Sequence, residues 1–228
     1  LPFLPTGDDP FAAGQPLLHW REQPRHPEPA SVSDEERQDI ETIRRRYEFW
    51  LLGTDEGSLD ALTGDVREEV QAFIREGWET YRNLGIRTDD EGWLTGPGLA
   101  MRRNTDSFHE VFNAALPLAF EYKLADSAEA RDAAVQLLDY AHDQGWAEGS
   151  ALGNCFLNIL TFAAYCHTLY LLRDVLEDTG RLDTHLRAAL WYLNFGKAFR
   201  AHDTPEQETN ADELRSTVFT SLPVILSM

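Results

Sequence analysis

Apolar side chains recur every three or four residues along most of this sequence, which is the period of an α-helix with one buried face. The clearest example is the face formed by Val66, Val70, Phe73, Ile74, Trp78 and Tyr81. The same spacing predicts further helices over residues 33–52, 107–124, 127–144, 151–179, 184–199 and from about 210 to the end. No segment shows a strong strand pattern. The sequence therefore predicts an all-α protein.

Local signals for helix ends agree with these ranges. Ser33 followed by Glu36 predicts a capping box, and Gly53 and Gly85 follow two of the predicted helices. Pro117 lies inside a predicted helix and is expected to kink it. Because most connections are short, consecutive helices are expected to pack as antiparallel hairpins.

Three segments are exceptions to the regular helical pattern, namely the two ends of the chain and one internal segment. Residues 1–32 are rich in Pro and Gly and predict an extended arm or linker, followed by a helical domain over residues 33–228. Residues 86–106 predict a long loop with a short hairpin, and long loops often carry function. The apolar end at residues 222–226 needs a cover, either within this chain or in a continuation beyond it. Continuation is the favoured interpretation, so we expect the helical domain to be truncated at its C-terminal end.

The acidic composition limits the partners of the chain. A formal net charge of -19 argues against a nucleic-acid-binding surface. An anionic polymer would need a local basic patch, for which Arg102 and Arg103 are candidates. The uncharged run over residues 151–172 contains Asn154 and Asn158 among other polar side chains, so it predicts a buried helix rather than a membrane span.

Little chemistry is visible from residue spacing alone. Cys155 and Cys166 would lie ~16 Å apart along one helix, which is too far for a disulfide. No metal-binding or cofactor-binding motif is present, so no cofactor is predicted. His167 lies in the most apolar segment and is expected to be a core histidine bonded to a neighbour. Trp93, in a glycine-rich loop, is a candidate sugar contact.

Three segments carry a resemblance to a known family. They are LGIRTD at 84–89 followed by GWLTG at 92–96, HDQGWAEGSAL at 142–152, and ALWY at 189–192. With these segments the chain, from Tyr81 onward, resembles polysaccharide lyase family 8. That family includes hyaluronate lyases and chondroitin AC and ABC lyases, and the ABC branch is the most similar.

The resemblance implies an incomplete (α/α) toroid, followed by β-sheet domains of the same polypeptide. It also implies a secreted or periplasmic bacterial lyase that cleaves an anionic polysaccharide, such as chondroitin or hyaluronan, by β-elimination. In the family an Asn neutralises the uronate carboxylate, and a Tyr and a His move the protons. The segment with that Tyr and His is expected beyond Met228, so this chain alone is not expected to be active.

Asn210 is the residue that the resemblance assigns to carboxylate neutralisation. It lies in TNADEL at 209–214, which is similar to the family's ANRxDL segment. The same residue is also a good N-cap for the helix that follows, and both interpretations stay open. The residues that the resemblance or the local composition places in substrate binding are Asn154, Phe156, Asn158, Trp93, Arg102 and Arg103.

Two other functions remain open. The ABC branch carries a His-His-Trp group where this chain has Phe156-Leu157-Asn158, which favours a catalytically incomplete, carbohydrate-binding toroid. A helical toroid can also hold a glycoside hydrolase with two catalytic carboxylates. No pair of carboxylates stands out in the sequence.

Overall fold

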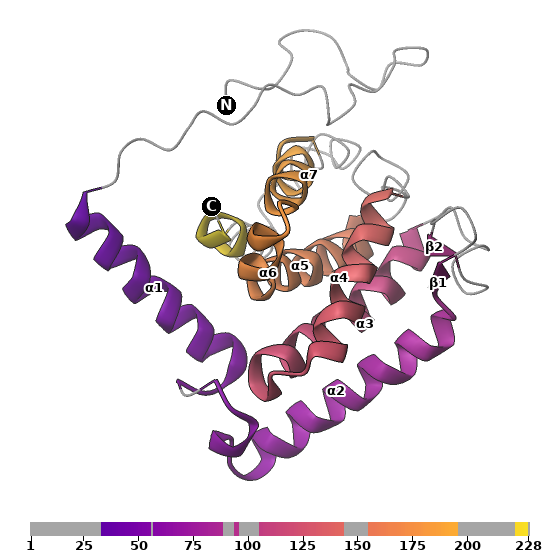
Figure 1. Cartoon of the computed structure of the whole chain (residues 1–228), viewed down its shortest axis with the longest axis horizontal. Coiled ribbons are helices and arrows are strands. Elements are labelled where there is room, and N and C mark those ends of the chain that lie inside the picture. Colours follow the sequence, from indigo (N-terminus) through magenta and orange to yellow (C-terminus); the bar gives the residue numbers. More distant parts are fainter. Residues whose placement is uncertain are drawn as a thin grey trace, which may run out of the picture.

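The computed structural model describes residues 33–55, 57–88, 94–95, 105–143, 155–195 and 222–227. Its elements, in chain order, are the helix α1 (Asp34–Leu52), the 3₁₀ turn η2 (Leu59–Ala61), α2 (Gly64–Leu84), the strands β1 (Arg87–Thr88) and β2 (Leu94–Thr95), α3 (Thr105–Ala125), α4 (Ala128–Asp143), α5 (Cys155–Leu171), α6 (Arg173–Asp178) and α7 (Leu182–Phe195). Figure 1 shows the helices stacked side by side, with α1 extending away from the others. The predicted all-α class is confirmed.

The predicted ends of α1, the predicted end of α2 and the predicted start of α4 are confirmed. The Ser33 side chain accepts from the backbone of Glu36, whose carboxylate accepts from the Ser33 backbone, so α1 begins at a complete capping box. Gly53 and Gly85 end α1 and α2 in the left-handed region, with φ of 76° and 61°. Glycine adopts this conformation without the steric cost that other residues meet. Ser127 accepts from the Ala130 backbone and caps α4.

The core is centred on α3, which packs against α2, α4 and α5. Its buried residues include Val111, Phe112 and Leu118, all with no exposed area. The predicted kink position, Pro117, lies within α3, which continues through it from Thr105 to Ala125. A Cβ on Gly77 of α2 would lie only 2.6 Å from the Pro117 ring, so Gly77 permits the close approach of these two helices.

One predicted helix is interrupted. The sequence predicts a single helix over residues 151–179, whereas the structure ends α5 at Leu171 and begins α6 at Arg173. The Arg173 side chain, at the start of α6, donates to the backbone oxygen of Tyr170 at 3.2 Å. This contact uses a backbone oxygen next to the break, where the sequence has neither Gly nor Pro.

The predicted short hairpin is present as a two-residue antiparallel pair. Arg87 of β1 faces Thr95 of β2, and Thr88 faces Leu94. This pair lies between α2 and α3 and is seen beside the C-terminal end of α2 in Figure 1.

Part of the apolar C-terminal segment is buried within this chain. Residues 222–227 form a short helix in which Val224 and Leu226 are buried. The Arg44 side chain of α1 donates to the backbone oxygen of Leu226 at 3.1 Å. The segment is therefore partly covered within this chain, while Ile225 remains 61% exposed. The predicted truncation of the domain stays a prediction.

The described helices also test the prediction that no membrane span is present. None of them is both long and apolar enough to cross a membrane.

Candidate functional site

The side chains of the predicted site residues all fall outside the described part of the chain. Phe156 and Asn158 lie in the first turns of α5, where the structure describes only the backbone. The other predicted site residues are in undescribed segments, namely Asn154, Trp93, Arg102, Arg103 and Asn210. Their predicted roles therefore stay predictions.

The elements that adjoin most of these residues share one end of the helical stack. Phe73 of α2 packs on Phe120 of α3, at 5.4 Å between ring centres, and Gly77 lies against Pro117, so α2 and α3 are antiparallel. The C-terminal end of α2, the β1–β2 pair and the N-terminal end of α3 consequently lie on the same side (Figure 1).

The start of α5 faces the same end. Phe112, near the N-terminal end of α3, contacts Tyr165 of α5 at 5.3 Å between ring centres. Lys123, near the C-terminal end of α3, pairs with Asp174 just after α5, at 3.2 Å. These contacts make α3 and α5 parallel, so both helices begin at the end of the stack that carries β1 and β2.

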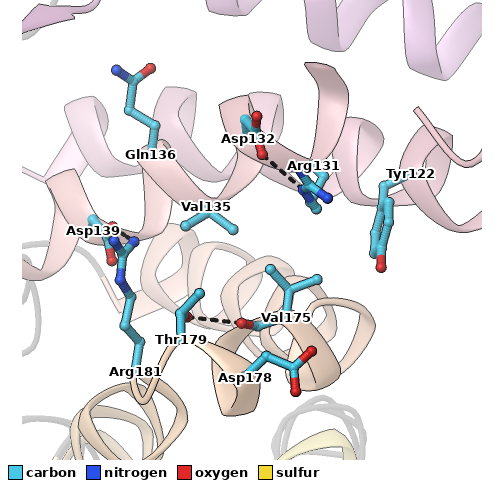
Figure 2. A pocket seen from close by; sticks show the side chains of 10 residues that line it. All are labelled: Tyr122, Arg131, Asp132, Val135, Gln136, Asp139, Val175, Asp178, Thr179 and Arg181. Atoms are coloured by element: carbon cyan, nitrogen blue, oxygen red, sulfur yellow. Dashed lines mark hydrogen bonds and ion pairs between the residues drawn. The ribbon is translucent and has the colours of Figure 1, made fainter. Parts of the chain in front are cut away.

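A pocket of about 580 Å³ lies elsewhere, between α4 and the α6–α7 region. Figure 2 shows Val135 and Val175 in its centre, with the Arg131–Asp132 ion pair toward one side and the Arg181–Asp139 ion pair toward the other. The lining residues are Tyr122, Arg131, Asp132, Val135, Gln136, Asp139, Val175, Asp178, Thr179 and Arg181.

The charge of this pocket does not suit an anionic polymer. Two arginines and three aspartates line it, so their formal charges sum to -1. Arg131 contacts Asp132 at 2.8 Å, and Arg181 is bonded to Asp139, so both cations already have anionic partners. A polyanion would have to displace these carboxylates and would meet the remaining Asp178.

A group of polar residues that includes Asp139 and Arg181 of this pocket joins α4, α5 and α7. The Tyr165 hydroxyl lies 3.0 Å from His185 Nδ1 and 3.1 Å from the His185 backbone oxygen. His185 Nε2 lies 3.3 Å from Asp139 Oδ1, and Arg181 donates to the other oxygen of the same carboxylate. We call Tyr165, His185, Asp139 and Arg181 the histidine relay.

The role of the Tyr165 hydroxyl follows from its surroundings. Burial raises the pKa of the Tyr165 hydroxyl, which therefore keeps its proton and donates to the His185 backbone oxygen. His185 Nε2 faces the Asp139 carboxylate on the opposite side of the ring. Sequence spacing could not reveal this group, because its members are 20 and 46 residues apart.

The histidine relay resembles an acid–base pair in composition, but its burial argues for a structural role. Tyr165 has no exposed area and His185 is 1% exposed. A residue that transfers protons to a polymer must reach it within hydrogen-bond distance. We therefore interpret the relay as a link between helices.

His167 makes a second buried histidine contact, with α1. Its Nδ1 is hydrogen bonded to the Tyr47 hydroxyl, and Trp50 packs beside its ring at 6.1 Å between centres. Burial lowers the pKa of His167 to about 4, so the ring is neutral near neutral pH. The prediction of a core histidine satisfied by a neighbour is confirmed.

Metal binding has no support in the described residues. They contain no group of three or more His, Cys, Asp or Glu side chains that could hold a metal ion. Cys166 is a buried free thiol, and burial raises its pKa well above the usual range. It therefore stays protonated and is a poor nucleophile or ligand.

Comparison with known proteins identifies the family. The family described as "Lyase, catalytic" matches residues 27–228, which is most of the chain. The chain belongs to the catalytic domain of polysaccharide lyase family 8. This lyase-family chain is also 25% identical, over 181 residues, to a chondroitin sulfate ABC exolyase of Bacteroides thetaiotaomicron. The predicted resemblance to this family is therefore confirmed.

The match covers very different shares of the two proteins. The match includes 78% of this lyase-family chain but only 16% of the exolyase. The comparison therefore concerns a small part of a much longer enzyme.

Proposed function

We propose that this chain is part of a polysaccharide lyase that cleaves a uronic-acid-containing glycosaminoglycan, of the chondroitin or hyaluronan type, by β-elimination. The observation that carries the proposal is membership of the lyase catalytic family over residues 27–228. The similarity to a chondroitin sulfate ABC exolyase supports this substrate class.

In the proposed reaction a base removes the proton at C5 of the uronate, and the C4–O bond breaks to leave a C4–C5 double bond. The proton at C5 is only weakly acidic while the neighbouring carboxylate is charged. Asn210 is proposed to donate hydrogen bonds to that carboxylate and so to stabilise the enolate-like transition state. The base, and the acid that protonates the leaving oxygen, are expected from residues beyond Met228.

The shared end of α2, α3 and α5 supports the proposed substrate contacts. Trp93 directly precedes β2, and Arg102 and Arg103 precede α3 by a few residues. Asn154 directly precedes α5, whose first turns contain Phe156 and Asn158. These side chains are proposed to bind the sugar chain, with Arg102 and Arg103 supplying a local positive charge in a chain of net charge -19.

The proposed location is outside the cytoplasm, either secreted or periplasmic, because glycosaminoglycans are too large and too charged to enter a cell unaided. Further β-sheet domains of the same polypeptide are part of the proposal.

The test is ultraviolet absorbance of the unsaturated product on hyaluronan, chondroitin, dermatan and heparan, using the longest natural polypeptide that contains this chain. The matched variants are Asn210→Ala and Asn113→Ala, because Asn113 is an exposed asparagine of α3. We expect Asn210→Ala to lower kcat at least ~100-fold, as loss of a transition-state hydrogen bond does. Asn113→Ala should keep full activity.

Each other outcome has a defined meaning. A folded Asn210→Ala protein with full activity contradicts the role of Asn210 and leaves it as a helix cap. Cleavage without ultraviolet absorbance indicates the hydrolase alternative, because hydrolysis leaves no double bond. Binding without cleavage indicates the incomplete carbohydrate-binding toroid, which the Phe156-Leu157-Asn158 sequence favours.

A further inference from the structure

The pocket between α4 and α6 is not used by the proposed lyase reaction. Two of its lining residues, Tyr122 and Arg131, lie near the short α3–α4 connection, whereas β1 and β2 lie beside the opposite end of α3. We propose that this pocket is a second carbohydrate site, which binds one neutral pyranose ring rather than a uronate. The proposal stands independently of lyase activity.

The charges of the pocket favour a neutral ligand. Arg131 and Arg181 are each paired with an aspartate of α4, and the lining has one negative charge in excess. A uronate would bring another negative charge next to these carboxylates without a cation left to pair with it. A neutral sugar meets no such penalty, and its hydroxyl groups can both donate to Asp and accept from Arg.

The polar groups of the pocket are already held in place. The carboxylate of Asp139 is bonded to Arg181 on one oxygen and faces His185 on the other. The Thr179 hydroxyl donates to the Val175 backbone at 2.8 Å, which leaves its oxygen as an acceptor. Groups that are ordered before binding lose little entropy when a ligand arrives.

Tyr122 adds a donor at one side of the pocket (Figure 2). Burial, together with the nearby Asp174, raises the pKa of Tyr122, so its hydroxyl remains protonated. Lys123 Nζ lies 5.5 Å from the centre of the same ring and covers one of its faces. The Tyr122 hydroxyl can therefore serve as a hydrogen-bond donor to a bound sugar.

The centre of the pocket is apolar and of suitable size. Val135 and Val175 lie between the two ion pairs in Figure 2, where they can contact the C–H groups of a sugar ring. The volume of about 580 Å³ lies within the range of small-molecule sites, ~300–1,000 Å³. A neutral ring with polar edges and an apolar face matches this arrangement.

The experiment is a titration of the isotope-labelled 228-residue chain with N-acetylglucosamine, N-acetylgalactosamine and glucuronate, followed by NMR. We expect at least one N-acetylhexosamine to shift the amide signals of α4 and α6, and glucuronate to bind at least about tenfold more weakly. The variant Arg131→Ala should weaken binding about tenfold, as loss of a charged hydrogen-bond partner does. Its matched control is Arg67→Ala, because Arg67 forms a comparable surface ion pair with Asp60 at 2.9 Å.

A second variant, Val135→Phe, keeps every charge and fills the pocket. It should abolish the shifts while leaving the remaining spectrum folded. The proposal is overturned if neither N-acetylhexosamine shifts α4 and α6, if glucuronate binds as well as the neutral sugars, or if both Arg131→Ala and Val135→Phe bind like the Arg67→Ala control. Because no cleavage is measured, an inactive lyase would not affect this result.

Discussion

The two described buried histidines, His167 and His185, show how different surroundings change the same contact. Each ring has its Nδ1 next to a tyrosine hydroxyl, that of Tyr47 for His167 and that of Tyr165 for His185. At the second nitrogen His185 faces Asp139. Within the described part of the chain, His167 has no carboxylate partner.

The two histidines therefore differ in how many helices they connect. We call the connection of three helices through His185 the joint, whereas His167 makes a contact between two helices. His185 links α7 to α4 and α5 through two ring nitrogens, and Arg181 extends the link to the α6–α7 connection. His167 links α5 to α1 through one ring nitrogen. Loss of the imidazole ring should therefore lower the free energy of unfolding more at His185 than at His167. Protonation of the ring at low pH should instead destabilise the fold at His167.

The largest expected effect is that of His185→Ala. This change leaves a cavity between three helices and removes partners from Tyr165 and Asp139, so we expect a loss of about 4 kcal/mol in the free energy of unfolding. His167→Ala removes one contact at a ring that is 8% exposed and should cost about 2 kcal/mol. Urea unfolding of both variants measures the difference. An equal or smaller loss for His185→Ala would contradict the proposed joint.

The next largest expected effect is a dependence of the stability on pH, caused by the titration of His167. Its pKa falls from 6.5 to about 4 on folding, so below pH 6.5 the unfolded chain binds a proton that the folded chain does not. Stability should fall as the pH falls through this window and level off below about pH 4. Between about pH 7.5 and about pH 5 the loss from this group is roughly 2 kcal/mol.

Urea unfolding at these two pH values, for the wild type and for His167→Gln, isolates that contribution. Glutamine keeps a polar group near the Tyr47 hydroxyl but does not titrate. The extra loss seen in the wild type should disappear in the variant. If both proteins lose the same stability, the pH dependence comes from other groups. That result would contradict the expected role of His167 in destabilising the fold at low pH.

The helices were predictable because their signals are local. The capping box at Ser33 and the glycines after Leu52 and Leu84 act within one or two turns, and they appear in the structure at the predicted positions. The break at Leu172 was not predictable, because it coincides with a side-chain bond of Arg173 to the Tyr170 backbone oxygen rather than with a Gly or Pro.

The candidate site also has features that the sequence could predict and features that it could not. Family membership was predictable from short motifs, and it is shown over residues 27–228. The histidine relay was not, because Asp139 and His185 are 46 residues apart and are brought together only in the folded chain. The lyase site residues, above all Asn210, were predicted from the resemblance, and their side chains lie outside the described residues.

The smallest expected effect is that of Arg181→Ala, which tests whether the buried histidine or the outer ion pair holds the joint. The Arg181 side chain is 46% exposed and that of Asp139 is 28% exposed, so water screens their attraction. An exposed pair of this kind contributes about 0.5 kcal/mol or less. Urea unfolding of Arg181→Ala should therefore be nearly that of the wild type, and high salt should remove the remaining difference. A loss as large as that of His185→Ala would instead place the strength of the joint in the Arg181–Asp139 pair.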